Sequence, residues 1–176
     1  MLTFLNLEAE GFCSIESLHL QLNPTCTILI KAPNGKGKST ILSSLVWAIY
    51  GKNLKGVSEV NTWKQVRPKD YKGTRVQVYF QKDSHTYKII RCQKYEGVLD
   101  DGAKGKDRLI FMKDGDIVDI KGKGKIQDFI NREIGLSYTL FMNSIMFGQG
   151  IKRLIQESNS DKKKIFEEVF DLEFLN

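Results

Sequence analysis

A stretch rich in glycine and lysine near the N-terminus has the residue types of a phosphate-binding loop. Residues 28–40 read ILIKAPNGKGKST. Glycines let successive backbone N–H groups turn toward one anion, and a helix that follows adds the partial positive charge of its N-terminus. The sequence therefore predicts a nucleotide site in this stretch, made by Pro33, Asn34, Gly35, Lys36, Gly37, Lys38, Ser39 and Thr40.

The last three residues of the stretch have separate predicted roles. Lys38 would contact the β- and γ-phosphates and act in catalysis, and Ser39 would offer its hydroxyl to Mg²⁺. Thr40 would donate to the α-phosphate. The implied ligands are ATP and Mg²⁺.

Two residues depart from the usual G-x-x-x-x-G-K-[ST] pattern. Ala32 stands where the first glycine is usual. Alanine is the smallest alternative, so the loop can form if Ala32 keeps a negative φ. Lys36 occupies a position where small residues are usual. Its side chain either adds to the attraction of phosphate or points to solvent, and we favour the solvent alternative.

The first half of the chain predicts strands around one apolar helix. That helix covers Lys38–Tyr50 and ends at Gly51, because apolar residues occupy most of its sides and glycine is a common C-terminal cap. A buried strand is predicted directly before the loop, at Thr25–Ile30. The other predicted strands are Leu2–Glu8, Ile15–Leu22, Thr74–Gln81, Tyr87–Cys92, Arg108–Lys113 and Asp116–Ile120, the last four as two hairpins.

The second half predicts loops and short helices. Residues 94–107 hold three glycines and several charges, which predicts a mobile loop. Lys121–Lys125 should break the chain before a helix at Ile126–Ile134. The remaining predictions are a short helix capped by Ser137 and running through Asn143, a buried strand at Ser144–Phe147, and a helix at Asp161–Phe170 with an apolar stripe of Ile165, Phe166, Val169 and Phe170.

Composition sets broad limits on function. The 176 residues carry a net charge of +6, and 41% are hydrophobic, which is an ordinary globular balance. The charge fits either a polyanion such as DNA or a solvated basic surface. The candidate DNA-phosphate contacts are Lys104, Lys106, Lys121, Lys123, Lys125, Lys152, Arg153, Lys162, Lys163 and Lys164.

The cysteines and the N-terminus indicate in which cellular compartment the protein works. Cys13, Cys26 and Cys92 have no zinc-type spacing, so reduced thiols are the simplest interpretation. No signal peptide or apolar span is visible, which leads us to expect no membrane partner and a cytoplasmic location. The family resemblance described below implies in addition a bacterial or phage-infected cell, or an association with the nucleoid.

Several motifs together resemble the ATPase heads of SMC-like DNA-repair proteins, of the SbcC type and its phage relatives. These are NGKGKST followed by a helix that closes with WAIYG, the hairpin TRVQVYFQKDSHTYKIIRC, and SYTLFMNSIMFGQG. The segment SDKKKIFEEVFDLEFLN resembles the family's helix into a long coiled coil. The resemblance implies an α/β fold with a P-loop NTPase core and an antiparallel β subdomain, in which Gln149 is the glutamine that touches Mg²⁺ and the attacking water. Thr62 and Trp63 join the predicted nucleotide-binding set.

The resemblance also implies what this chain does not contain. Cys13 stands where relatives often carry an arginine near the nucleotide. No Ser-Gly-Gly run or apolar run ending in Asp-Glu occurs, and Asp116 and Asp119 belong to a predicted hairpin. We therefore expect residues 1–176 to be one N-terminal lobe. The implied partners are a C-terminal lobe, a second head, a nuclease subunit and DNA. Two alternatives stay open, a RecF-like ATPase that binds DNA gaps and a nucleotide-binding clamp without turnover.

Overall fold

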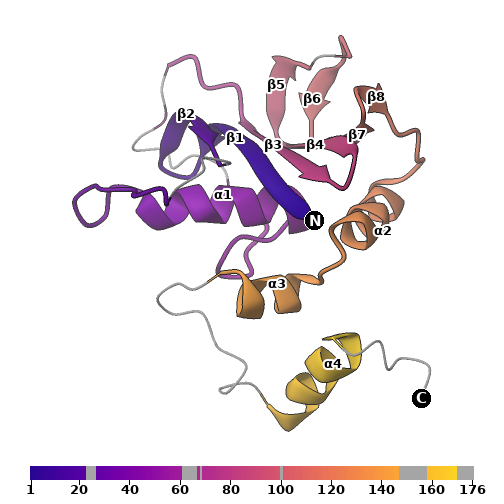
Figure 1. The fold of residues 1–176 in the computed structure, drawn as a ribbon. Coiled ribbons are helices and arrows are strands. Elements are labelled where there is room, and N and C mark those ends of the chain that lie inside the picture. The colour runs from indigo at the N-terminus through magenta and orange to yellow at the C-terminus, as the bar shows by residue number, and fades with distance from the viewer. Residues whose placement is uncertain (23–26, 61–66, 68, 100, 147–157, 170–176) are drawn as a thin grey trace. The chain divides into compact units, whose positions relative to one another are not determined.

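The computed structural model describes residues 1–22, 27–60, 67, 69–99, 101–146 and 158–169 (Figure 1). The chain divides into two compact units, Met1–Ile134 and Gly135–Asn176. Each unit has its own arrangement of elements and is described separately.

An antiparallel sheet forms the framework of the first unit. Its strand order is β2-β1-β3-β4-β7-β8, and every strand pair in the described residues is antiparallel. The predicted N-terminal strands and both predicted hairpins are confirmed. The strands are β1 (Leu2–Phe12), β2 (Ile15–Gln21), β3 (Thr74–Lys82), β4 (His85–Gln93), β7 (Leu109–Lys113) and β8 (Asp116–Ile117).

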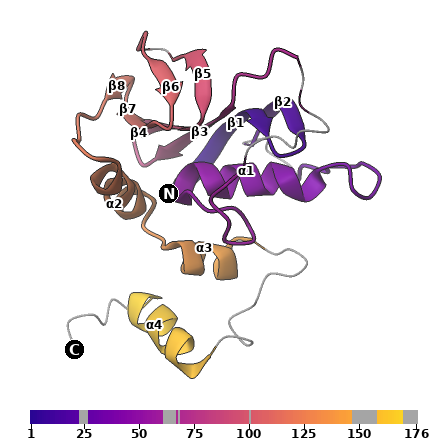
Figure 2. The same cartoon turned by 180° about the vertical axis from the view of Figure 1, so that it is seen from behind.

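Helices α1 (Lys38–Tyr50) and α2 (Lys123–Ile134) lie on one face of this sheet (Figures 1 and 2). The bounds of α1 are those predicted, and Gly51 caps its end with a left-handed φ of 72° and an N–H bond to the carbonyl of Trp47. Alternate residues of the central strands point to this face because strand side chains alternate. The core between sheet and helices includes Val46, Ile49, Val76, Val78, Phe80, Ile89, Phe111 and Ile130, each at most 1% exposed.

The opposite face carries a small hairpin where a mobile loop was predicted. Strands β5 (Tyr95–Val98) and β6 (Lys104–Lys106) pair antiparallel and rise from the sheet (Figure 1). Tyr95 and Leu99 are buried against Ile90, Cys92 and Ile110. The prediction was wrong because it weighed glycines and charges, whereas these two apolar side chains anchor the segment by burial.

Helix α2 begins inside the lysine-glycine stretch rather than after it. It starts at Lys123, and the N–H of Ile126 already bonds to the carbonyl of Gly122 at 3.1 Å. The predicted break therefore holds only for Lys121 and Gly122, where φ of the glycine is 101°. Lysine is a good helix former, and these side chains stay exposed while Ile130 and Ile134 are buried.

The second unit contributes two short helices. In α3 (Tyr138–Ser144), the Ser137 side chain accepts from the N–H of Leu140, so the predicted cap is confirmed. The predicted strand at Ser144–Phe147 is wrong for its described residues, since Ser144 is helical and Ile145 caps the helix. Helix α4 (Asn159–Val169) starts two residues early. On its predicted stripe Ile165 is buried, but Phe166 is 48% exposed and is not a core residue.

Candidate nucleotide-binding site

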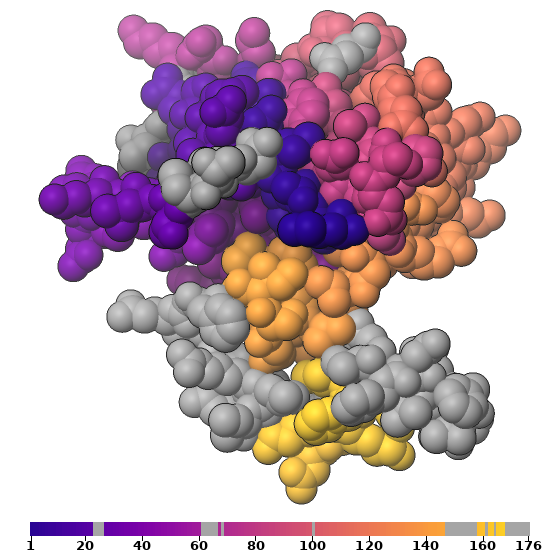
Figure 3. All heavy atoms as spheres, in the orientation of Figure 1, coloured from indigo at the N-terminus to yellow at the C-terminus, as the bar shows by residue number. Residues whose placement is uncertain are grey.

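The strand predicted before the loop does not form in the described residues. Residues 27–30 are irregular, and Leu29 and Ile28 are 84% and 38% exposed. A strand needs neighbours for its N–H and C=O groups, and no described strand lies beside this segment in a ladder. The apolar sequence is therefore present without the pairing that would bury it. Figure 3 shows the segment that leads into α1 projecting from the surface of the first unit.

The loop itself has the backbone that a phosphate site requires. Gly35 and Gly37 take left-handed φ values of 78° and 85°. Gly37 is the N-terminal cap of α1 and its carbonyl accepts the N–H groups of Thr40 and Ile41 at 3.0 and 3.2 Å. No side chain in the part of the chain that the structure describes caps this helix, and its first turn holds no acidic residue. The first N–H groups of a helix have no acceptor within it, so this end favours an anion.

Lys38 is held across the loop. Its Nζ donates to the carbonyls of Ala32 at 2.6 Å and Pro33 at 3.0 Å. An ammonium has three donors, so these bonds leave one for an anion. Ser39 is exposed beside it, with its hydroxyl available to a cation. The residues present thus fit a phosphate and its metal, with Lys38 for the anion and Ser39 for Mg²⁺.

The two departures from the usual pattern are tolerated. Ala32 is not among the residues with positive φ, which meets the condition set by its methyl group. Lys36 is exposed, in agreement with the solvent interpretation, and its backbone N–H bonds to Pro33 at 3.4 Å.

One neighbour of the loop was missed by sequence reasoning. Ser14, in the turn between β1 and β2, donates through Oγ to Thr40 Oγ1 at 3.4 Å. A Cβ built on Gly37 would lie 3.1 Å from Ser14 Oγ, so a side chain at position 37 would crowd the serine hydroxyl. Cys13, which precedes Ser14, is the residue that the sequence resemblance aligns with an arginine near the nucleotide in relatives. Burial raises the pKa of its thiol, so it carries no charge to replace that arginine.

A buried arginine fixes the far end of α1. Arg91 donates to the carbonyls of Ala48 at 2.9 Å and Ile49 at 3.1 Å, and to Gln127 of α2. Burial lowers its pKa to about 10, so it remains charged at neutral pH. A cation at a helix C-terminus is favourable, and here it compensates for the lack of basic residues in the last turn of α1.

Other predicted site residues are not brought to the loop by the described structure. Gln149, Thr62 and Trp63 lie outside the described residues, as do Lys152 and Arg153. Asp116 is in β8 and exposed, as expected for a structural hairpin residue. Within the described ranges no group of His, Cys, Asp and Glu side chains could hold a metal ion, and no helix there is long and apolar enough to cross a membrane.

Comparisons with known proteins place the chain in a family. The family described as "AAA domain" matches residues 6–174, so the chain belongs to it. A DNA double-strand break repair Rad50 ATPase of Methanopyrus kandleri is 23% identical over 94% of this chain and 18% of its own length. Exonuclease subunit 2 of Escherichia phage RB69 is 24% identical over 88% of this chain and 25% of its own length. The chain thus spans a quarter or less of these curated relatives.

A solved structure supports the fold class. It comes from work described as the structural biochemistry of ATP-driven dimerization and DNA stimulated activation of SMC ATPases. The TM-score is 0.56 at 19% identity, covering 95% of this chain and 99% of that one. The predicted resemblance to an SMC-like, SbcC-type ATPase head and the P-loop NTPase fold class are thereby confirmed.

Proposed function

We propose that residues 1–176 are the N-terminal lobe of an ATPase head that acts in DNA repair or recombination. Mg-ATP binds at Asn34–Thr40, with Lys38 on the β- and γ-phosphates and Ser39 on the metal. Gln149 completes the metal contacts, and Thr62 and Trp63 contact the nucleotide. The observation that carries the proposal is the loop geometry. Two left-handed glycines precede a helix that has no side-chain cap among the described residues, and Lys38 bonds back across the loop.

Residues 27–30, which pair with no strand among the described residues, support the need for a further lobe. Its residues are Thr-Ile-Leu-Ile, and the exposed Leu29 is costly in water at roughly 25 cal/mol per Å². Strands supplied by a C-terminal lobe would pair with this segment and bury it. The same lobe would bring the carboxylates that orient water, which a loop of N–H groups and Lys38 does not supply.

The names of relatives suggest the wider machine. The relatives include a Rad50 double-strand break repair ATPase and a phage exonuclease subunit, and the solved neighbour concerns SMC dimerization and DNA. By analogy, two heads of this protein would close around two nucleotides, and that movement would control the access of a nuclease partner to DNA. The exposed lysines of Lys121–Lys125 would hold DNA phosphates without reading sequence.

Calorimetric titration of ATP into residues 1–176 tests the central proposal. Saturable binding that weakens when Mg²⁺ is omitted is expected, because the metal bridges Ser39 to the phosphates. GTP and inorganic triphosphate serve as comparisons for the base. If ATP, GTP and inorganic triphosphate all fail to bind saturably, the proposed nucleotide site is wrong.

A further inference from the structure

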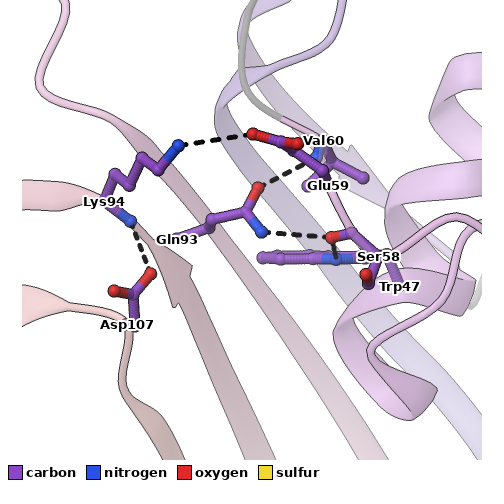
Figure 4. Close-up of polar contacts among 7 residues, drawn as sticks. All are labelled: Trp47, Ser58, Glu59, Val60, Gln93, Lys94 and Asp107. Carbon is purple, nitrogen blue, oxygen red and sulfur yellow. Dashed lines mark hydrogen bonds and ion pairs between the residues drawn. The ribbon is translucent and has the colours of Figure 1, made fainter.

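A short irregular segment, Ser58–Val60, is fixed by side chains rather than by a strand partner. The Ser58 carbonyl accepts two donors, Trp47 Nε1 at 3.0 Å and Gln93 Nε2 at 3.1 Å (Figure 4). Trp47 belongs to α1 and Gln93 is the last residue of β4. Val60 is 1% exposed, so the segment is anchored by burial as well.

Gln93 binds the segment in the way a neighbouring strand would. Its Oε1 accepts the N–H of Val60 at 2.9 Å, while its Nε2 donates to Ser58 (Figure 4). One primary amide thus satisfies a donor and an acceptor two residues apart. The amide carries its donor and its acceptor on two separate atoms, whereas an ionised carboxylate only accepts.

The contacts continue from Val60 to the phosphate loop. The Val60 carbonyl accepts the N–H of Cys13 at 3.0 Å, and Cys13 Sγ lies 3.7 Å from the same oxygen. The next residue, Ser14, contacts Thr40 and closely approaches Gly37. An unbroken series of contacts therefore runs from β4 through Val60 and the β1–β2 turn to the first turn of α1.

We propose that Gln93 is a positioning residue for the phosphate loop. It holds Val60, Val60 holds the turn that carries Ser14, and that turn fixes Thr40 and Gly37 where phosphate is to bind. This role rests on the proposed nucleotide binding, although the contacts of Gln93 can be tested without nucleotide. The amide itself touches neither ATP nor metal.

The adjacent residue provides a matched control. Lys94 Nζ pairs with Glu59 at 3.3 Å, and both side chains are about two-thirds exposed or more, at 67% and 71%. Such a surface pair contributes little, and the partner of Lys94 Nζ is Glu59 rather than Val60. Lys94→Ala removes a contact to the same segment without removing the hold on Val60.

Two substitutions at Gln93 separate positioning from general stability. Gln93→Leu keeps the size but removes both bonds. Gln93→Glu keeps an acceptor for Val60, but its ionised oxygen faces the Ser58 carbonyl. Protonation gives back a donor and restores both bonds. The ionisable neighbours Glu59, Lys94 and Asp107 are all exposed, and both Gln93 variants retain them (Figure 4).

The experiment combines binding of a fluorescent ATP analogue with amide hydrogen exchange. For Gln93→Leu we expect faster exchange at Val60 and Cys13 and an affinity lower by about fivefold, the effect of roughly one net hydrogen bond. For Gln93→Glu we expect the loss near pH 8 and its recovery as the pH falls below about 4.3, the usual pKa of a glutamate, relative to wild type at each pH. Lys94→Ala should match wild type in both measurements.

The outcomes distinguish this proposal from the proposed function. If wild type binds no nucleotide, the nucleotide site fails, and unchanged exchange at Cys13 in Gln93→Leu would separately overturn the series of contacts. If wild type binds and both Gln93 variants bind equally well, the positioning role is wrong. Equal losses in Gln93→Leu and Lys94→Ala would also overturn it.

Discussion

At the scale of single residues, the loop depends on backbone freedom and one well-held charge. Gly35 and Gly37 adopt φ values that other residues rarely tolerate, and Lys38 is tied to two loop carbonyls. Lys36, two positions away, carries the same charge but is exposed. The two lysines therefore differ in placement and not in chemistry.

Lys38→Ala should weaken Mg-ATP binding at least about tenfold, or roughly 1.4 kcal/mol, because a charge-assisted contact to phosphate is lost. Lys36→Ala should cost much less, since its exposed charge is screened by solvent. Calorimetric titration of both variants measures the difference. Equal losses would mean that the loop has been assigned wrongly.

At the scale of elements, α1 is fixed at both ends from outside the helix. In its first turn, Thr40 accepts a hydrogen bond from Ser14. Its last carbonyls accept hydrogen bonds from Arg91, which also donates to Gln127 of α2. The negative end of the helix dipole and the buried guanidinium compensate each other. Contacts from β4 and α2 thus hold the C-terminal end of the helix whose N-terminus carries the loop.

Arg91→Met should lower the free energy of unfolding by about 2–3 kcal/mol, because the carbonyls of Ala48 and Ile49 and the amide of Gln127 lose a buried donor. Urea denaturation measures this. Arg132→Ala, at an exposed position of α2, is the control and should change stability little. A neutral or stabilising effect of Arg91→Met would show that desolvation of the guanidinium outweighs its hydrogen bonds.

Neutralising Lys121, Lys123 and Lys125 to Gln should lower DNA affinity alike for all sequences and reduce the salt dependence by at most about three phosphate contacts. Lys123 and Lys125 lie in the first turn of α2, where positive charge opposes the helix dipole. The change should therefore not destabilise the helix, and unfolding would not explain a loss. The control is a variant neutralised at the exposed Lys55, Lys69 and Lys72. If both variants leave the salt dependence of DNA binding unchanged, Lys121, Lys123 and Lys125 face solvent and do not contact DNA.

The elements that sequence predicted correctly are those whose signal is local. The extent of α1 follows from its apolar residues and Gly51, and the hairpins follow from alternation and from Asp114-Gly115. Residues 27–30 were predicted wrongly because a strand needs a partner that the local sequence does not reveal, and no described strand pairs with them. The β5–β6 hairpin was missed because its glycines and charges hid the burial of Tyr95 and Leu99. Ser14 and Gln93 were missed for the same reason, since their partners lie 26 to 35 positions away.

At the scale of the whole molecule, the described residues contain the proposed nucleotide loop but not the carboxylates that would complete a catalytic site. The described carboxylates do not form a metal-binding cluster. The apolar residues before the loop lack a strand partner among the described residues. Both features are explained by one proposed partner, a C-terminal lobe that pairs with residues 27–30 and supplies the carboxylates.

Residues 1–176 alone should bind ATP but hydrolyse it barely above background. Charge stabilisation by Lys38 and the loop, without a placed water, leaves most of the barrier in place. Adding the C-terminal lobe, joined or in trans, should raise turnover steeply and make it depend on protein concentration, because two heads must meet. The same lobe should protect the Leu29 amide from hydrogen exchange as residues 27–30 pair with it.

Phosphate release measured over a dilution series checks the rise in turnover, with Lys38→Ala as the inactive control. Robust turnover by this chain alone, independent of concentration, would contradict the proposal and would make Asp116, Asp119 and Glu133 the first carboxylates to substitute. Turnover that stayed absent with the lobe and DNA present would instead favour the clamp without hydrolysis.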